Sequence, residues 1–392
     1  MLYKRVFLIT LIFLIALTVI PFNLPAEESP RVGTWVTVFS PEKPFDSRAN
    51  SDRLIETCKK CGIQDIYLQL YRADKAYYDS DLTERGLPKE IQQDTLTYLI
   101  NTAKDNNLKI HAWINLLSIA QNENSNIVKK FGEEVLTMDQ YGKSSMKGTN
   151  TIDKYYIREP QIFLEPGDPR VRKYFADIAE EIIKKYPSLS GLHLDYIRYP
   201  FIVPFLPGSR FSSHGISYGY GKSNIERFEK DTGLNVNTMQ KTRENFQAWD
   251  DWRRKQVTLL VGAISQRVRA LSPQIEISCA INPTIDRAYL SSFQDWPEWL
   301  DKGFADHVVA MNYTDDSRLM ELNSRSLSAI RPGKKVHIGI TAYLLKDNIE
   351  EFKNQFASLQ KLSCPGIVLF SYDTIAESEE IQELLKNELG RK

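Results

Sequence analysis

Short apolar segments recur along the chain, and stretches with helical spacing separate them. The first segment, 32–38, alternates between apolar and polar positions and is rich in β-branched residues. A later one, 191–195, is nearly all apolar, which is typical of a strand buried on both faces of a parallel sheet. The same criteria predict eight strands, at 32–38, 66–71, 110–116, 191–195, 275–281, 307–313, 336–342 and 367–372.

The segments between the predicted strands carry apolar residues at helical spacing. One helix is expected to begin at Asp168–Pro169, because aspartate is a preferred N-cap and proline suits the first turn. Eight strands, each followed by a helix or a helix-containing segment, predict an α/β chain forming a single closed (β/α)8 TIM barrel rather than an open doubly wound sheet. The first strand is not followed by a glycine-rich phosphate loop, which disfavours a dinucleotide-binding fold. Long polar passages at 121–161 and 201–236 predict insertions after strands three and four.

The first 26 residues have the layout of a targeting segment. A basic pair at 4–5 precedes an apolar run that Pro21 breaks, and Ala26 offers a small residue for cleavage. The run is too short for a comfortable membrane span, so it predicts a secretory signal peptide, with an uncleaved N-terminal anchor as the alternative. We therefore assign 1–26 to this segment and 27–392 to the barrel. We expect a secreted, periplasmic or cell-envelope protein that meets the membrane only through this segment, if it is uncleaved.

The charge balance of the chain narrows the classes of partner, and its cysteine content narrows the roles that the cysteines can have. The chain has 50 basic and 50 acidic residues, so its composition gives no reason to expect binding to nucleic acid or to an anionic membrane surface. Four cysteines in 392 residues do not make a disulfide scaffold. Cys58 and Cys61 have a redox or metal spacing, but no second pair accompanies them and both fall in the last turn of a predicted helix. A structural role is the better interpretation.

Candidate chemistry lies where the predicted strands end, because barrel enzymes draw their active sites from the carboxyl ends of several strands. These ends carry carboxylates, amides and aromatic rings but no histidine. His111 and His193 fall within strands and are expected to form interior hydrogen-bonded layers. The pattern provides neither a metal site nor a serine triad, so we expect no metal and no cofactor. Two carboxyl groups framed by aromatic faces and amides would suit glycoside hydrolysis.

Asp195, at the end of the fourth strand, is the first predicted catalytic carboxylate. Asp315 is chosen as its partner, because the segment after the sixth strand faces the cleft from the fourth. The alternatives are other carboxyl groups near strand ends or on the third loop: Asp316, Asp373 and Glu165. Simpler interpretations stay open, in which Asp195 caps a loop and is neutralised by Arg198, and Asp315 with its neighbour caps the next helix. The residues expected to bind a substrate lie at or near strand ends: Trp35, Tyr71, Trp113, Asn115, Arg198, Tyr199, Asn312, Tyr313 and Tyr372.

Several stretches spread across the chain after residue 26 resemble one family of bacterial proteins. The matching segments are 35–37, 108–115 (Leu-Lys-Ile-His-Ala-Trp-Ile-Asn), 163–172, 191–200, 249–254 and 311–314. They are similar to the family-ten-like glycosyl hydrolases, which are envelope-associated barrel proteins. Many members carry two consecutive aspartates at the end of the fourth strand, whereas Tyr196 follows Asp195 here. The resemblance therefore leaves the second carboxylate open.

The resemblance implies a barrel glycosidase that acts on bacterial cell-wall glycan, such as peptidoglycan strands, or on another envelope polysaccharide. It also places Asp195 in the active site. Together with the strand-end carboxylates, it predicts a glycoside hydrolase whose partner is an oligo- or polysaccharide substrate. The alternative is a non-catalytic carbohydrate-binding barrel that kept the cleft and lost the chemistry.

Overall fold

Eight parallel strands close into a barrel in the computed structural model, which describes residues 30–87, 94–145, 156–158, 161–200, 202–204, 216–330 and 335–389. The strands follow one another around the ring in chain order, and the ring closes because β1 pairs with both β2 and β12. The barrel strands are β1 (Arg31–Val36), β2 (Asp65–Arg72), β5 (Lys109–Asn115), β7 (Gly191–Asp195), β9 (Glu276–Ile281), β10 (His307–Met311), β11 (Val336–Thr341) and β12 (Gly366–Phe370). The predicted barrel is confirmed, and each predicted strand matches an observed one to within two residues at either end.

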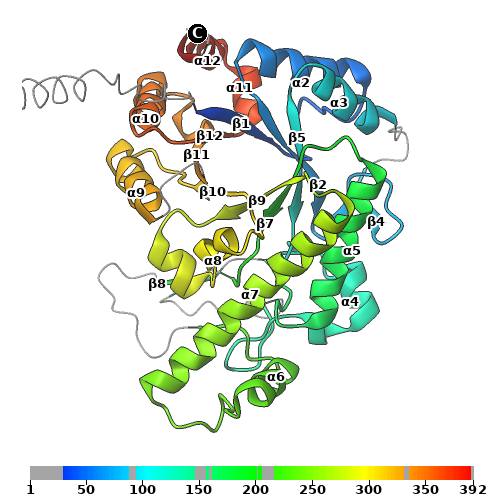
Figure 1. Ribbon diagram of the computed structural model, residues 1–392, viewed down its shortest axis with the longest axis vertical. Helices are drawn as coiled ribbons and strands as arrows, with labels where there is room; N and C mark the ends of the chain where they lie inside the picture. Colours follow the sequence, from blue (N-terminus) through cyan, green and yellow to red (C-terminus); the bar gives the residue numbers. More distant parts are fainter. Residues whose placement is uncertain are drawn as a thin grey trace, which may run out of the picture.

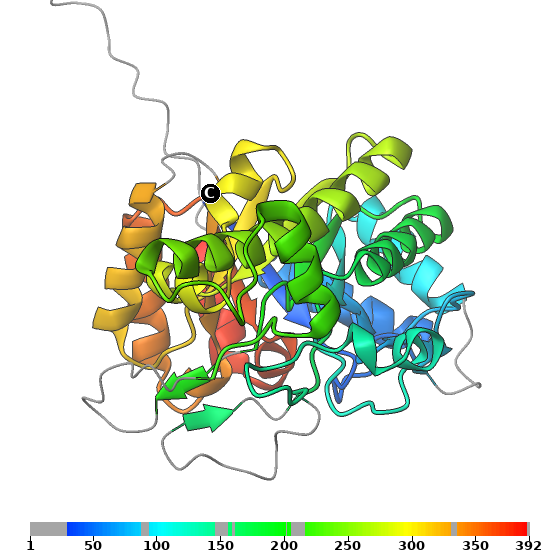
Figure 2. The same cartoon turned by 90° about the horizontal axis from the view of Figure 1, so that it is seen from below.

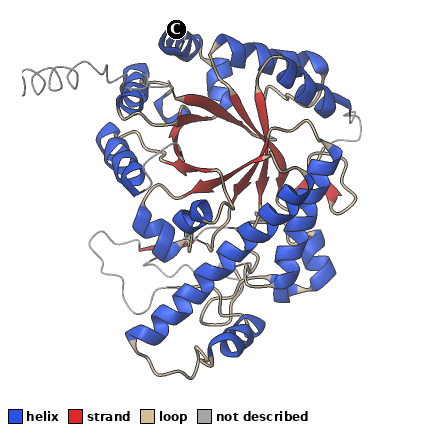
Figure 3. Cartoon of the chain, viewed as in Figure 1, coloured by secondary structure: helices blue, strands red, loops and turns tan. Residues whose placement is uncertain are grey.

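Helices surround the barrel (Figures 1 and 3). α5 (Pro169–Lys185) begins where it was predicted, because the Asp168 side chain accepts a hydrogen bond from the backbone N–H of Arg170. α7 (Arg243–Leu271) packs against α5, and the apolar residues between the helices and the sheet form the main core. The other helices around the barrel are α2 (Arg48–Lys60), α3 (Asp94–Asp105), α8 (Trp296–Asp301), α9 (Ser317–Ile330), α10 (Ile349–Lys361), α11 (Tyr372–Glu377) and α12 (Glu379–Leu389).

Two long connections leave the barrel, one between β5 and α5 and one between β7 and α7. The first contains α4 (Asn126–Phe131) and β6 (Tyr156–Arg158), and the second contains β8 (Ile202–Pro204) and α6 (Lys222–Thr232). β6 and β8 pair in antiparallel fashion, so the two connections meet in a small sheet at one end of the molecule (Figure 2). Two further short strands, β3 (Lys75–Ala76) and β4 (Glu84–Arg85), extend the edge of β2.

Inside the barrel, large rings face small residues. A cluster of aromatic and branched side chains fills the centre: Trp35, Tyr67, Trp113, Val309 and Val368. Gly339 faces the first of these rings, and a Cβ at this position would lie 2.9 Å from Cη2 of Trp35. The glycine therefore makes room for an indole in a barrel that is only just wide enough for side chains.

A buried ionic network closes the N-terminal end of the barrel. Arg31 donates hydrogen bonds to Asp65 (Nε to Oδ2, 2.9 Å) and to Glu276 (Nη1 to Oε1, 2.7 Å). Nε2 of His111 lies 2.8 Å from Oδ1 of Asp65, and Nδ1 of His307 lies 3.1 Å from Oε1 of Glu276. Burial alone would raise the pKa of both acids, but these partners outweigh it and hold the pKa of Asp65 and of Glu276 well below the ordinary range. Both acids are therefore ionised in the folded protein.

Two further expectations concern the N-terminus and the cysteines. The predicted targeting segment, 1–26, lies outside the described residues. Across the ranges that the structure does describe, no helix has the length and apolar character needed to cross a membrane.

Cys58 and Cys61 are buried free thiols, and burial raises the pKa of Cys61 to about 11. Inert, buried thiols agree with a structural role.

Candidate active site

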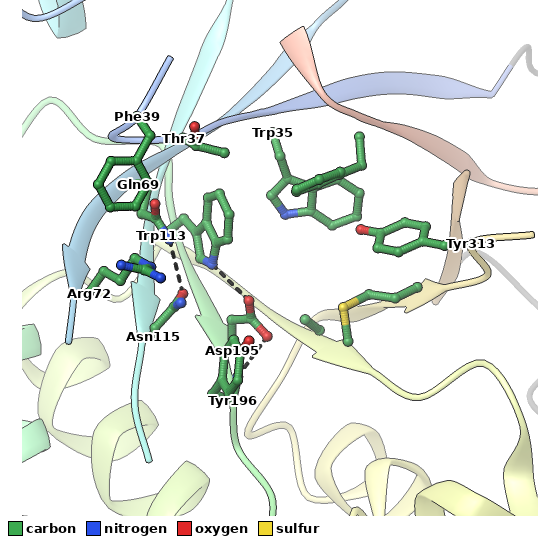
Figure 4. A pocket seen from close by; sticks show the side chains of 13 residues that line it. Trp35, Thr37, Phe39, Gln69, Arg72, Trp113, Asn115, Asp195, Tyr196 and Tyr313 are labelled. Carbon is green, nitrogen blue, oxygen red and sulfur yellow. Dashed lines mark hydrogen bonds between the residues drawn. The ribbon is translucent and has the colours of Figure 1, made fainter. Parts of the chain in front are cut away.

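A cavity of about 270 Å³ lies at the C-terminal ends of the barrel strands (Figure 4). Its wall is mainly aromatic, with two amides, one carboxylate and one guanidinium. The described residues that line it are Trp35, Thr37, Phe39, Gln69, Arg72, Trp113, Asn115, Asp195, Tyr196, Ala280, Met311, Tyr313 and Phe370. This is the end of the barrel at which enzymes of this fold place their chemistry.

Asp195 is held in one orientation at the end of β7. Its Oδ2 accepts a hydrogen bond from the indole N–H of Trp113 on β5 (3.1 Å), and its Oδ1 accepts one from the backbone N–H of Tyr196 (2.6 Å). The residue is 7% exposed and lines the cavity. N–H donors to both oxygens therefore fix the orientation of this carboxyl group in the cavity wall.

Tyr196, which follows Asp195, adopts an unusual backbone conformation. Its φ is 53°, in the left-handed region that residues other than glycine seldom occupy. Its N–H turns back to the Asp195 carboxylate, its ring lines the cavity, and the guanidinium of Arg198 lies 5.0 Å from the ring centroid. Backbone strain of this kind persists only where the surrounding structure maintains it. It is concentrated at functional sites.

His193 positions one of the rings in the cavity wall. The indole N–H of Trp35 donates to Nε2 of His193 (3.2 Å), and Nδ1 of the same imidazole lies 2.8 Å from Oγ of Ser278. Burial, together with the neighbouring His307 and His111, lowers the pKa of His193 well below its usual value. The ring is therefore neutral, and because Nε2 accepts a hydrogen bond, Nδ1 carries the proton and donates to Ser278. The predicted interior role of His193 is confirmed.

An irregularity in β2 decides which of its side chains reach the cavity. The pairing of β2 with β5 joins Gln69 to Trp113 but joins Tyr71 to Ile114, so β2 contains one extra residue, a β-bulge. In a regular strand, side chains alternate and Tyr71 would share the inner face with Gln69. The bulge breaks the alternation, so that Arg72 lines the cavity and Tyr71 does not.

Tyr71 and Asn312 were predicted to bind a substrate, but both belong to the outer side of the barrel. Tyr71 is fully buried, packs against Phe175 of α5 with ring centroids 6.2 Å apart, and donates a hydrogen bond to Asp74 (2.7 Å). Asn312 lies between Met311 and Tyr313, which both line the cavity. Its own side-chain amide donates outward to the carbonyl of Met320 in α9 (2.8 Å). Neither side chain is placed for a direct contact with a ligand.

Three other predicted substrate contacts are also buried away from the cavity wall. The hydroxyl of Tyr199 donates to Glu165 (2.6 Å). Arg198 donates to the carbonyl of Tyr199 (3.2 Å), and its guanidinium lies 5.3 Å from the ring centroid of Phe163. Tyr372 is buried at the start of α11, because β12 ends two residues before it. These side chains shape the surroundings of the site and are not part of its surface.

The structure does bring five of the predicted site residues together. They line the same cavity: Trp35, Trp113, Asn115, Asp195 and Tyr313. Burial and the charge of Asp195 raise the pKa of Tyr313 well above its usual value, so this phenol stays protonated and keeps a proton to donate. Their roles in binding and catalysis stay predictions.

The predicted first choice of partner for Asp195 lies outside the cavity wall. Asp315 is exposed in the turn between β10 and α9. Asp316, next to it, is also exposed and accepts a hydrogen bond from the backbone N–H of Leu319 (3.0 Å), which makes it the cap of α9. The capping interpretation therefore holds for Asp316, and Asp315 stays a candidate two residues beyond Tyr313.

The other two candidates are more enclosed. Asp373 is half-buried and accepts a hydrogen bond from the hydroxyl of Ser40. Glu165 is buried and accepts hydrogen bonds from the hydroxyls of Tyr199 (2.6 Å) and Thr137 (2.9 Å). Burial raises the pKa of both acids, which favours the protonated form that a general acid needs. Neither is among the described residues of the cavity wall.

Eight lining residues were not among the predicted site residues. They share inward-facing positions at strand ends or the turns beyond them: Thr37, Phe39, Gln69, Arg72, Tyr196, Ala280, Met311 and Phe370. Strict alternation from the central cluster would have found Thr37, Gln69, Met311 and Phe370, because each lies two residues beyond a ring or branched side chain of that cluster. Within the described ranges, no group of three or more histidine, cysteine or acidic side chains is arranged to hold a metal ion.

Comparison with known proteins identifies the family. The chain matches the model of the glycosyl hydrolase-like 10 family over residues 31–356. It is 23% identical over 374 residues to glycosyl hydrolase YngK of Bacillus subtilis, covering 87% of this chain and 64% of that protein, so the chain spans less than two thirds of this relative. It is 20% identical over 370 residues to glycosyl hydrolase DigH of Escherichia coli, covering 84% of this chain and 76% of that protein. The catalytic domain of β-amylase from Paenibacillus polymyxa shares the fold, with a TM-score of 0.59 and 11% identity over 93% of this chain and 98% of that one. The chain belongs to the glycosyl hydrolase-like 10 family.

Proposed function

We propose that this protein hydrolyses glycosidic bonds in a bacterial cell-envelope polysaccharide, such as the glycan strands of peptidoglycan. The observation that carries the proposal is the Asp195 carboxylate, fixed by Trp113 and by the backbone N–H of Tyr196 inside an aromatic-walled cavity. Aromatic faces and a few placed polar groups are what a sugar-binding pocket needs. The family and the two relatives, both called glycosyl hydrolases, support the class of reaction.

Asp195 acts in this proposal as the ionised carboxylate, either as nucleophile or as base. A second carboxyl group must be protonated to assist the departure of the leaving oxygen. We assign this role to Asp315, because its segment passes the cavity at Tyr313 and its exposed side chain makes no hydrogen bond with a described residue. This role requires that the Asp315 carboxyl group reaches the scissile bond when a substrate binds.

The envelope location rests on the N-terminal sequence. A basic pair followed by an apolar run and a small residue within 1–26 is typical of a secretory signal or an N-terminal anchor. Either one would deliver the barrel to the compartment that contains the envelope glycan.

Substitution of the two carboxylates tests the mechanism. Asp195→Asn and Asp315→Asn should each lower kcat on glycan strands by roughly 10²- to 10⁴-fold, the usual contribution of an acid or base. Asp316→Asn is the matched control, since this neighbouring residue caps α9 and should affect stability only. Azide should restore turnover to Asp195→Ala if the missing carboxylate is a nucleophile. Undiminished turnover by Asp195→Asn would remove this residue from the mechanism.

A carbohydrate-binding barrel without turnover is the second candidate function. It is favoured by one observation, that Asp195 is the single carboxylate among the described residues that line the cavity. Wild-type protein that binds glycan strands in calorimetry but releases no reducing ends would establish this function, and release of reducing ends would exclude it.

A further inference from the structure

We infer that Arg72 recognises a carboxylate on the glycan, so that the site selects an acidic sugar. The inference deepens the proposed function and rests on it. Arg72 ends β2 and is the only cationic side chain among the described residues of the cavity wall. Figure 4 shows its guanidinium beside Asn115, on the same side of the cavity as Phe39.

The guanidinium of Arg72 has no acceptor among the residues that the structure describes. Within the described part of the chain it forms no hydrogen bond and no ion pair, and its Cζ lies 4.7 Å from the ring centroid of Phe39. Phe39 is 65% exposed and lines the same cavity, so the guanidinium over its ring lies in the cavity wall. A cation stacked on an aromatic face in this way keeps its planar set of donors oriented.

Asp195 does not neutralise Arg72 directly. The ends of β2 and β7 are separated by β5, which places their backbones two strand spacings, roughly 10 Å, apart. The Asp195 oxygens accept hydrogen bonds from Trp113 and from the backbone of Tyr196, and no ion pair joins Asp195 to Arg72. The cavity therefore presents separate anionic and cationic positions on neighbouring parts of its wall.

A carboxylate is the ligand group that matches this arrangement. Arginine binds carboxylates through two parallel N–H···O bonds, and a neutral hydroxyl would use only part of this donor set. The β-bulge in β2 supports the assignment, because it places the arginine, and not the tyrosine before it, in the cavity wall. The carboxylate can belong to a hexuronic acid or to a lactyl ether on an amino sugar, and both present the same planar anion.

Binding by the catalytically impaired Asp195→Asn protein tests the inference. The ligands are a hexuronic-acid oligosaccharide and a muramic-acid-containing glycan, each compared with the same compound after reduction of its carboxyl group to an alcohol. At least one acidic ligand should bind roughly 10- to 100-fold more tightly than its reduced form, as expected for hydrogen bonds to a charged group. The ligand that shows the difference identifies the source of the carboxylate.

Substitution of Arg72 in the same background should abolish that preference. Arg72→Met should bind acidic and reduced ligands about equally, because the acidic ligand should lose much more affinity than the reduced one, and Arg72→Lys should keep part of the difference. Arg48→Gln is the matched control, because Arg48 pairs with Asp94 at the exposed surface between α2 and α3. A preference that survives in Arg72→Met, or an equal loss for both ligands, would overturn the inference and leave the proposed function standing. If no glycan binds to the Asp195→Asn protein and none is cleaved by the wild type, both the inference and the proposed function are refuted.

Discussion

Trp113→Phe removes one hydrogen bond from the candidate site and keeps an aromatic face in the cavity wall. The deleted bond joins the indole N–H to Oδ2 of Asp195 at 3.1 Å, and its acceptor is only 7% exposed. A hydrogen bond to a charged group contributes about 1.5–3 kcal/mol. If Asp195 performs the chemistry and this bond holds it in its reactive orientation, kcat should fall by up to roughly 10- to 150-fold.

Steady-state kinetics on glycan strands, with thermal unfolding measured in parallel, would check this expectation. Trp35→Phe is the matched control, because its indole N–H also lies in the barrel interior but donates to His193 instead of Asp195. Both variants should lose about 1 kcal/mol of stability from reduced packing, and kcat should fall much further in Trp113→Phe. Equal losses of kcat in the two variants, or a kcat within threefold of wild type for Trp113→Phe, would refute the assigned role of the bond.

The remaining predictions concern the outer core and the N-terminal end of the barrel. Tyr71→Phe should cost about 1–2 kcal/mol of unfolding free energy, because buried Asp74 loses a donor, and should leave kcat/KM unchanged. A fall in kcat/KM without a fall in Tm would instead place Tyr71 at the ligand. The lowered pKa of Asp65 and of Glu276 means that these acids stabilise the fold above their unfolded pKa near 4, and that this contribution is lost as the pH falls below about 4. Urea midpoints at pH 7 and pH 3.5 should show this loss, and the drop should be smaller in Asp65→Asn; an equal drop in both proteins would contradict the assignment.

Hydrophobic periodicity was sufficient to predict the barrel, because every barrel strand is buried on both faces over most of its length. It also placed Asp195 and Trp113 in one cavity, since both lie at inward-facing positions near the ends of adjacent paired strands. Asn312 does not line the cavity, for a local reason. Side chains alternate along this segment, and Met311 and Tyr313 on either side of Asn312 are the ones that line the cavity.

Other parts of the site depend on long-range contacts that a single sequence does not report. Tyr199 follows Asp195 closely in the chain, yet its hydroxyl reaches Glu165 on the preceding long connection. Tyr372 was expected at the end of a strand, but the chain turns into α11 there and buries the ring. Hydrophobic periodicity indicates which face of a strand each side chain occupies. It does not indicate the residue at which the strand ends, because that depends on how the following segment packs.

The bulge in β2 has a consequence for how this cavity could change in evolution. Tyr71 and Arg72 are adjacent and have very different side chains, and only one of them can lie in the cavity wall. The single unpaired residue between Gln69 and Tyr71 determines that it is Arg72. A relative that moved or lost this irregularity without changing the sequence around it would exchange a cation for a phenol at the ligand. Ligand chemistry in this barrel can therefore diverge through strand register alone, without a substitution of Tyr71 or Arg72.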